Sequence, residues 1–527
     1  MPFRPCGRRQ TVAKDIRSRA WCNAGGAWRR WIRAAGRWDT SPLSRPPEGD
    51  CVASPESSWF DAVVIGGGAG GTLVAARLLD AKAGGGRVAL VETRPDVAEG
   101  VAYSTRRGEH LLNVRAAGMS AFDEAPMDFV DFLRRQPDYA SVAAAELATR
   151  FMPRMVYARY LQSVLDSRPG RDRLRRFTDM AVDVVPVEGG GFTVELASGA
   201  RLRARAVVLA VGNRPARLPL ADAGAATVKA GEVVEAWDYP AVAAIPTDAN
   251  VCILGAGLSM VDVVLSLEAR GHRGRVVSIS RSGLLPLEHA VPGPVAPIDV
   301  PAVLAMDLRA RLRTLRALAA AESAQGRPWQ GVMDALRPHV QALWTSLDAA
   351  GQRLFLRHLV RYWDVHRHRI APEVAGRLRA ATDAGRLQCL AGRLVAVEAG
   401  RPLEIVWRPR GQARTQRLEA DVLVNALGMD KRIEGGDGLL ANLQRRGLMR
   451  PGPHHMGAAT SGVGAVLGAD GQSVPGLWTL GVLRIGDLWE TIAMPDLRGQ
   501  ARDVAKAVQA ADQLGGWITS EASLKRE

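Results

Sequence analysis

Apolar runs alternate with glycine-rich turns along this chain in a way that predicts two strand–turn–helix units. The first unit opens with DAVVIG at Asp61, passes through glycines into apolar positions at helical spacing, and ends with RVALVE at Glu92. A similar unit covers residues 250–280, where VCILGAG leads into a helix and then into RVVSIS. Each unit is of the kind that builds a parallel sheet, so their wide separation predicts two separate sheets.

The strand pattern disappears between Pro292 and Pro372. Apolar residues recur there at helical spacing, in two groups: Leu304, Leu308, Leu312 and Leu315, and Val340, Leu343, Trp344 and Leu347. This spacing predicts a mostly helical insertion. Short strand-like runs return at about residues 385–430, and a strand and a helix over 478–508 complete the chain, which indicates a return to the first domain.

A glycine motif GxGxxG stands where the first strand meets its helix. The loop and the helix start comprise Gly66, Gly68, Ala69, Gly70 and Gly71. Glycines here permit a tight turn and a close backbone approach to a pyrophosphate, and the helix N-terminus supplies free N–H groups. Glu92 closes the next strand, where its carboxylate can accept hydrogen bonds from the ribose of an adenosine. The alternative is a glycine-rich turn without a ligand, with Glu92 as a solvated charge.

The second unit carries a weaker version of the motif. Gly255 and Gly257 repeat the first two glycines, but Met260 takes the place of the third. The following strand ends at Arg281 and has no acid there. A carboxylate would repel the 2′-phosphate of NADPH, whereas a guanidinium can pair with it through two hydrogen bonds. The sequence therefore predicts NADPH rather than NADH, with a degenerate fold that binds no nucleotide as the alternative.

Charge and hydropathy narrow the range of partners. The formal net charge is +15 over 527 residues, and the basic residues are mostly Arg. Because no nucleic-acid-binding motif accompanies them, we predict no nucleic-acid partner. A basic surface would instead help to attract anionic NADPH. We also expect no membrane partner, since no uninterrupted apolar run is long enough for a transmembrane helix.

Cysteine usage favours a reducing compartment. The five cysteines are Cys6, Cys22, Cys51, Cys252 and Cys389, an odd number at wide spacings without a CxxC pair. This pattern argues against a disulfide framework, a zinc site and a redox-active disulfide. We therefore predict a cytoplasmic protein, and no metal site.

Longer segments carry a combination of motifs that is more specific than the glycine loops alone. They are GVAYST from Gly100, HLLNVRAAGMSAF from His110, FMPRMVYARYL from Phe151, LAVGNRPA from Leu209, VCILGAGLSMVDVVLSL from Val251, RYWDVHRHRIAP from Arg361 and GLWTLGVLRIGDLWETIAMPDLRGQA from Gly476. Together, over about residues 60–510, they resemble the FAD-NAD(P)-binding family of bacterial flavoproteins. More distantly, the layout is similar to flavin-containing and N-hydroxylating monooxygenases. The resemblance implies FAD, NAD(P)H and an oxidoreductase role, but no particular substrate.

The pattern and the resemblance together predict the fold class and the domains. The fold is α/β with two dinucleotide-binding, Rossmann-like domains, the NAD(P) domain being inserted in the FAD domain and carrying a helical insertion. The predicted segments are 1–58, a disordered basic N-terminal extension; 59–220, the first part of the FAD domain; 221–290, the first part of the NAD(P) domain; 291–372, the helical insertion; 373–430, the return strands of the NAD(P) domain; 431–515, the C-terminal part of the FAD domain; and 516–527, a tail. For residues 1–58, an upstream start codon and a targeting or surface-binding arm are the alternatives.

The resemblance also adds residues to the flavin site. Asn113 and Arg115 are implied to border the flavin, and Gly212 follows a strand of the same domain. Many related reductases end their last strand in an acid that holds the ribityl chain, whereas this chain has Gly481 there. We therefore expect backbone groups to hold FAD at that place, together with Thr491 and Ala493 of the closing loop.

Few side chains are needed for catalysis, because the flavin itself carries out the difficult step. The segment WDVHRHR nevertheless concentrates His366, His368 and Arg369 behind a predicted helix. Imidazole can exchange a proton near neutral pH, and arginine can hold an anionic substrate. The alternative is a polar helix end that packs against the rest of the chain. Glu490 and Trp489 are weaker candidates.

Three functions fit these features. The first is an NADPH-dependent monooxygenase or hydroxylase that uses O2 on a small-molecule substrate. The second is a dehydrogenase or reductase with the same cofactors and no oxygen activation. The third is a scaffold or redox sensor that binds FAD and NAD(P) with little turnover, which the intact first loop and Arg281 disfavour only weakly.

Overall fold

The computed structural model describes residues 59–80, 86–219, 233–291 and 298–513. All of them belong to one compact unit, Pro55–Glu527. Some predictions lie outside the described residues. They are those for residues 1–58, for the start of the NAD(P) domain at 221, for the first residues of the insertion and for the tail at 516–527.

The first sheet is built around the apolar run that the sequence placed in a strand, β1 (Trp59–Ile65). Its order is β14-β15-β6-β1-β2-β3, with β5 also paired to β6 and β4 to β5. The parallel strands are β1, β2 (Val88–Glu92), β3 (Leu174–Thr178), β6 (Arg201–Leu209) and β15 (Ser473–Thr479). The antiparallel additions are β4 (Ala181–Pro186), β5 (Phe192–Leu196) and β14 (Ala465–Leu467).

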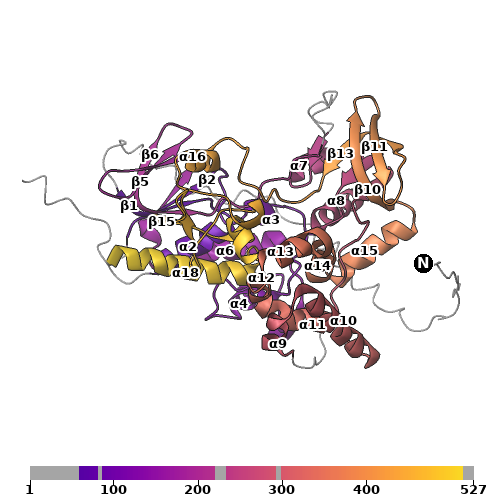
Figure 1. The fold of residues 1–527 in the computed structure, drawn as a ribbon, viewed down its shortest axis with the longest axis horizontal. Helices are drawn as coiled ribbons and strands as arrows, with labels where there is room; N and C mark the ends of the chain where they lie inside the picture. The colour runs from indigo at the N-terminus through magenta and orange to yellow at the C-terminus, as the bar shows by residue number, and fades with distance from the viewer. Residues whose placement is uncertain (1–58, 81–85, 220–232, 292–297, 514–527) are drawn as a thin grey trace, which may run out of the picture. The chain divides into compact units, whose positions relative to one another are not determined.

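Helices cover this sheet because its central strands are apolar on both faces. Val63 and Val64, which point to opposite faces of β1, are both fully buried. One face packs against α2 (Ala69–Leu79), α6 (Arg154–Asp166) and α18 (Met494–Gln513) (Figure 1). The other face packs against α16 (Leu439–Arg445) and the β4–β5 hairpin. Shorter helices in the connections are α3 (Gly100–Tyr103), α4 (Asp128–Arg134), α5 (Ala144–Thr149) and α17 (Ile485–Leu488).

The second sheet has the order β12-β11-β10-β9-β8-β13-β7. Its strands are β7 (Val233–Glu235), β8 (Val251–Leu254), β9 (Val276–Ser280), β10 (Leu387–Glu398), β11 (Leu403–Pro409), β12 (Gln416–Ala420) and β13 (Val422–Asn425). All of them lie in the chain between β6 and β14 of the first sheet. The second fold is thus inserted in the first, and the predicted fold class is confirmed.

One face of the second sheet packs against α7 (Tyr239–Ala244), α8 (Leu258–Ala269) and α15 (Pro372–Asp383). The five strands from β10 to β7 are parallel, whereas β11 and β12 add an antiparallel edge. In both sheets the central strand, β1 or β8, leads directly into a glycine turn and a helix. This is the point at which dinucleotide folds bind their ligand, outside the carboxyl ends of the strands.

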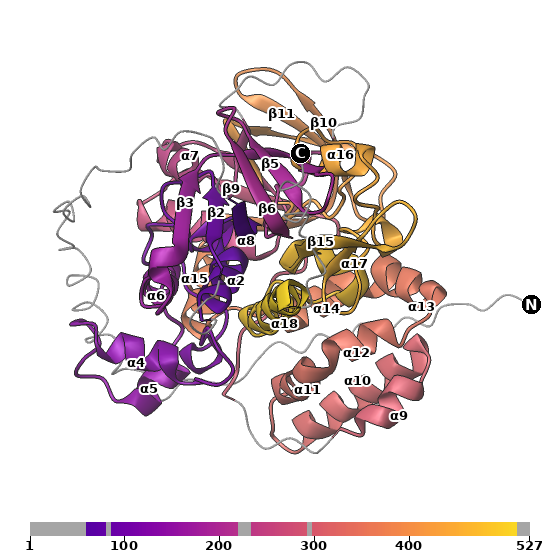
Figure 2. The ribbon, with the colours of Figure 1, turned by 90° about the vertical axis from the view of Figure 1, so that its left-hand side faces the viewer.

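Residues 298–371 contain helices and no named strand, as predicted for the insertion (Figure 2). The helices are α9 (Val300–Ala305), α10 (Leu308–Ala324), α11 (Gln330–Leu336), α12 (Val340–Thr345), α13 (Ala349–Leu354) and α14 (Val360–Arg367). The spacing of leucines from Leu304 to Leu315 does not correspond to one helix, because the Asp307 side chain accepts a hydrogen bond from Ala310 N and starts α10 anew. A π-helical turn at Phe355–Leu359 joins α13 to α14, and such turns often occur at functional sites.

Candidate cofactor and substrate site

The first glycine loop depends on two glycines for its backbone shape. Gly66 has φ +105°, and a Cβ built on it would lie 2.2 Å from the carbonyl oxygen of Ala210, just beyond β6. A Cβ on Gly71 would lie 1.8 Å from the carbonyl oxygen of Gly66. Gly68 differs, because its Cβ would meet only Gly100, at 3.4 Å. Gly66 and Gly71 therefore shape the turn, whereas Gly68 leaves space beside the helix start.

The start of α2 fits a phosphate group. Gly68 is the N-cap residue, no side chain caps the helix, and the first turn has no acidic residue. The first N–H groups, those of Ala69, Gly70 and Gly71, have no intrahelical acceptor, so they are available to an anion. The helix dipole adds a partial positive charge at the same place.

Glu92 is fixed against the glycine loop. Its Oε2 accepts a hydrogen bond from Gly67 N at 2.7 Å, and its Oε1 accepts from Thr93 Oγ1 at 3.0 Å and from Arg94 N at 3.1 Å. The carboxylate thus stands at the end of β2 beside the helix start. This is where an adenosine ribose would require it.

The end of the last strand and the closing loop, residues 489–493, meet through one side chain. Gln500 of α18 accepts from Gly481 N through Oε1, at 3.0 Å, and donates from Nε2 to Thr491 O, at 2.9 Å. The Thr491 hydroxyl is buried and has no hydrogen-bond partner among the described residues. An unpartnered buried hydroxyl fits a site for a polar ligand such as FAD. Gly481 N is already bonded, so its backbone amide is not free for the flavin.

Gly212 and Ala493, which are also predicted to border the flavin, lie where the backbone turns. Gly212 follows β6 with φ +68° and has open space where a side chain would be. Ala493 precedes α18, and its carbonyl accepts hydrogen bonds from Asp496 N and Leu497 N in the first turn. Both residues thus lie in connections of the first fold, one after a strand and one before a helix.

The second glycine loop repeats the geometry of the first. Gly255 has φ +117°, and a Cβ on it would lie 2.2 Å from the carbonyl oxygen of Ala426, just beyond β13. Gly257 is the N-cap residue of α8, with open space around it and no side-chain cap. Met260, at the third position, is fully buried in the core of this fold. The fold therefore accommodates the side chain and keeps an uncapped helix N-terminus.

Basic side chains surround the second loop. Arg281 follows β9 and is exposed. Arg361 of α14 donates through Nη2 to the carbonyl oxygens of Ala256 and Leu284, both at 3.1 Å. Arg361 could not be predicted as part of this site, because a single arginine on a predicted helix gives no signal of what it contacts.

The three predicted catalytic residues lie in different environments. His366 donates through Nδ1 to Tyr362 O, 2.7 Å away, and its ring packs edge-on against Trp329. Arg369 is buried and bonded to Asp334 and to Gln330 O. These contacts place His366 and Arg369 against the insertion, whereas His368 interacts with the charges of Glu490 and Asp364.

A group of polar side chains gathers around the C-terminal half of α14, and we call it the α14 cluster. Its members are Trp363, Asp364, Arg367, His368, Lys431 and Glu490. Trp363 Nε1 donates to Glu490 Oε1 at 3.0 Å, and Arg367 Nη2 lies 3.0 Å from Glu490 Oε2. The Lys431 ammonium stands 4.5 Å from the ring centre of Trp489. The cluster thus joins the insertion, the closing loop and the segment after β13.

Burial shifts the proton equilibria in this cluster. It lowers the pKa of His368 and of Lys431, and it raises the pKa of Asp364. Burial also acts to raise the pKa of Glu490, but Arg367 and His368 hold that pKa below its ordinary value. His368 is therefore a neutral imidazole near pH 7 and able to accept a proton.

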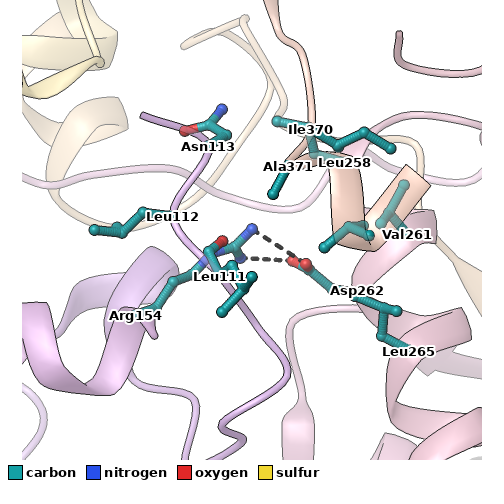
Figure 3. Close-up of a pocket in the computed structure, with 11 residues that line it drawn as sticks. Leu111, Leu112, Asn113, Arg154, Leu258, Val261, Asp262, Leu265, Ile370 and Ala371 are labelled. Atoms are coloured by element: carbon teal, nitrogen blue, oxygen red, sulfur yellow. Dashed lines mark hydrogen bonds and ion pairs between the residues drawn. The ribbon is translucent and has the colours of Figure 1, made fainter. Parts of the chain in front are cut away.

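Asn113 and Arg115 lie on the segment that borders the second fold. The carbonyl of Asn113 is 3.0 Å from His289 Nε2, and Arg115 Nη2 donates to Ala290 O at 3.2 Å. A small cavity of about 20 Å³ lies beside Asn113, between this segment and α8. Figure 3 shows the residues that line it. The volume is that of a water molecule rather than of a substrate.

Among the described residues, no group of three or more His, Cys, Asp or Glu side chains is arranged to hold a metal ion. None of the helices in the described part of the chain combines the length and apolar character needed to cross a bilayer.

Comparison with known proteins agrees with this geometry. Residues 63–214 match the family model described as FAD-NAD(P)-binding. A comparison with curated protein sequences finds no match.

Solved structures resemble the chain over most of its length. An ornithine N-hydroxylase from Kutzneria sp. 744, with reduced FAD, NADP+ and L-ornithine, has a TM-score of 0.61 at 15% identity and covers 86% of this chain and 100% of its own. An L-lysine 6-monooxygenase from Pseudomonas syringae has a TM-score of 0.61 at 18% identity, with 86% and 99% covered. A bacillithiol disulfide reductase from Staphylococcus aureus has a TM-score of 0.51 at 14% identity, with 87% and 100% covered. At these identities the likeness shows the fold.

The fold and the two glycine loops define a flavoprotein oxidoreductase of the two-dinucleotide-fold class. Residues 63–214 match the model of the FAD-NAD(P)-binding family, so the predicted resemblance is confirmed for this part of the chain. The predicted cofactors, FAD and NAD(P)H, and the predicted class of enzyme are confirmed with it.

Proposed function

We propose that this chain is an NADPH-dependent flavin monooxygenase that hydroxylates a small molecule with O2. The supporting observation is the contact of α14 with the closing loop, where Trp363 and Arg367 both bind Glu490. Aromatic rings surround this contact, since Trp344 and Phe355 pack on Trp489 at 5.2 and 5.3 Å between ring centres. Oxygen transfer from a flavin requires a site from which water is excluded, and an aromatic cover over the closing loop favours such a site.

Bound FAD would supply the hydride acceptor and the oxygen chemistry, with NADPH as the hydride donor. We assign the FAD phosphates to the N-terminus of α2, the adenosine ribose to Glu92 and a polar group of the flavin half to the Thr491 hydroxyl. We assign the NADPH pyrophosphate to the N-terminus of α8 and its 2′-phosphate to Arg281. The assignment of Glu92 rests on its place at the end of β2, since both of its carboxylate oxygens already accept hydrogen bonds. Each other assignment rests on a group that the protein leaves free: uncapped N–H groups, an unpartnered hydroxyl or an exposed guanidinium.

His368 is the side chain that we propose for proton exchange at the substrate. Its lowered pKa keeps the imidazole neutral near pH 7, and the charges of Glu490 and Asp364 act in favour of the protonated form once a proton arrives. His366 and Arg369 are proposed to position the end of α14 instead, because their side chains contact other residues of the helical insertion. Of the two predicted catalytic histidines, we therefore propose only His368 for the proton exchange.

The similar solved structures support an oxygenase over a reductase. The ornithine and lysine hydroxylases reach higher TM-scores, 0.61, than the disulfide reductase, 0.51. The chain also lacks a CxxC pair that a dithiol mechanism would use. The substrate is proposed only as a small molecule that reaches the α14 cluster.

Rapid mixing tests this proposal. The purified protein is loaded with FAD, reduced with NADPH and mixed with oxygenated buffer while the flavin absorbance is recorded. An oxygenase should show a transient species with a spectrum unlike that of oxidised or reduced flavin before reoxidation is complete. Direct, single-step reoxidation would instead favour the dehydrogenase or reductase, and protein that neither binds FAD nor oxidises NADPH would favour a scaffold.

A further inference from the structure

The two nucleotide folds are joined by a buried, two-pronged ion pair. Arg154 is the first residue of α6 in the FAD fold, and Asp262 lies in the second turn of α8 in the second fold. Arg154 Nη1 donates to Asp262 Oδ2 at 2.6 Å, and Arg154 Nη2 donates to Asp262 Oδ1 at 3.1 Å (Figure 3). The side chains are only 14% and 9% exposed.

Further hydrogen bonds reinforce the pair from the FAD side. Arg154 Nε donates to Leu111 O at 3.0 Å. The buried ring of His110 lies with Nε2 3.0 Å from Asp262 O and 2.8 Å from Ser266 Oγ, while its Nδ1 lies 2.8 Å from Thr105 Oγ1. Three polar groups of α8, all within its second and third turns, are thus bound by the FAD fold.

The same segment also contacts the loop that follows β9 in the second fold. The carbonyl of Asn113 is bonded to His289, and Arg115 donates to Ala290 O. Residues 110–115 are therefore tied to the second fold at successive points. We call this contact the inter-fold seam, made of residues 110–115, Arg154, Asp262, Ser266, His289 and Ala290.

We propose that the Arg154–Asp262 pair positions α8, and with it the second pyrophosphate cradle, for hydride transfer between the two bound nucleotides. This inference rests on the proposed function and adds a positioning role to it. Asp262 lies one helical turn after Leu258, the first residue of α8, so the pair holds the helix close to the cradle at its N-terminus. Hydride transfer requires the reacting atoms at about 3–3.5 Å, and a misplacement of about 1 Å can cost about a hundredfold in rate.

The energy of a buried ion pair allows a positioning role to be distinguished from a stabilising one. A buried ion pair adds little net stability, because the cost of removing two charges from water offsets their attraction. Its two parallel hydrogen bonds do, however, fix both distance and orientation. If the pair serves alignment, then an apolar replacement of similar volume should restore stability without restoring the rate of flavin reduction.

The first variant is Asp262→Asn in the full-length, FAD-loaded protein. It leaves the Arg154 charge buried and uncompensated, so the melting temperature should fall. At saturating NADPH, the rate constant of flavin reduction should fall about tenfold or more, while the Kd for NADP+ should change less than about threefold. Hydrogen exchange should rise in α8 and in residues 110–115, a readout that needs no turnover.

The second variant is the double replacement Arg154→Met with Asp262→Leu. It removes both charges and keeps the volume, so the melting temperature should recover toward that of the original protein. The rate constant of flavin reduction should stay low. If that rate recovers together with stability, then the pair is structural and the positioning role is wrong.

Asp183→Asn is the matched control. Asp183 also forms a two-pronged pair, at 2.7–3.2 Å, with Arg446, whose side chain is more exposed, at 39%, and both residues belong to the FAD fold. This variant should lose stability and keep the rate of flavin reduction. If no protein in the series, the original included, is reduced by NADPH, then the proposed function fails; unchanged hydrogen exchange in Asp262→Asn would overturn the positioning role separately.

Discussion

The guanidinium of Arg367 and the carboxylate of Glu490 form an ion pair, 3.0 Å from Nη2 to Oε2, with side chains only 13% and 5% exposed. The pair links the helical insertion to the loop that precedes α18. Since Trp363 binds the other oxygen of the same carboxylate, Glu490 has no oxygen without a protein partner. Glu490 therefore holds α14 to the closing loop through two side-chain contacts.

Glu490→Gln should disturb both stability and turnover. The substitution leaves the Arg367 charge buried without its partner, and breaking such a pair costs about 3–5 kcal/mol in the free energy of unfolding. NADPH oxidation stimulated by a substrate should fall, while the FAD content of the folded protein should not change. Denaturant unfolding, flavin absorbance and NADPH consumption measure these three quantities. Glu434→Gln, which removes a pair with the exposed His455, is the control and should affect none of them strongly.

Gly68→Val and Gly257→Val should each impair the binding of one nucleotide and not of the other. Each glycine is the N-cap residue of an uncapped helix and has little or nothing near its Cβ position, so valine fills the space of the phosphate without breaking the turn. We expect the first variant to fold without yellow flavin colour and to bind little added FAD. The second should keep FAD and lose affinity for NADPH. Retention of stoichiometric FAD by Gly68→Val would contradict the assignment of the first loop.

Arg281→Ala should weaken the binding of NADPH more than the binding of NADH. A charge-assisted, two-pronged contact with the 2′-phosphate contributes about 1.5–3 kcal/mol, which corresponds to an increase in Kd of about tenfold or more. NADH has no such phosphate, so its Kd should change little. Titration of the protein with each nucleotide gives the two Kd values. Equal changes in both would contradict the assignment of the 2′-phosphate to Arg281. Arg313→Ala, on the exposed surface of α10, is the charge-matched control.

The inter-fold seam should weaken in acid. Burial lowers the pKa of His289 to about 4, with Arg369 and Arg115 acting in the same direction and Asp334 against it. Because the unfolded state takes up a proton near pH 6.5, stability contributed by the neutral ring is complete above that pH and is lost as the pH falls toward about 4. His289→Gln should therefore show a smaller drop in melting temperature between pH 7 and pH 5. His358→Gln, at an exposed position, should show the same drop as the original protein.

Much of the fold could be predicted because it depends on local pattern. The runs at β1 and β8, their glycine turns and the helices after them are contiguous in sequence, and the backbone geometry confirms why glycine is needed at Gly66 and Gly255. Helix boundaries inside the insertion were harder to predict. The capping side chain of Asp307 interrupts a leucine spacing that reads as one helix.

The candidate site could be predicted only in part. The free helix N-termini and Glu92 follow from the order of elements, since a strand end and the next helix start must lie together. His366, His368 and Arg369 lie within four positions of the sequence, yet only His368 interacts with the α14 cluster. The helix ends at Arg367, so the three residues do not continue one helical face. Lys431 carried no signal, because its neighbours Asp364 and Trp489 are distant in the chain.

By itself, the sequence determined that two dinucleotide folds would form and which glycines would start them, and it predicts NADPH for the second fold. These properties reside in short segments whose conformation depends on their own residues. Tertiary structure alone decided that Arg154 would meet Asp262 and that Arg367 would meet Glu490. Each of these pairs joins residues more than a hundred positions apart, and buried charges are paired only when packing of the whole chain brings them together.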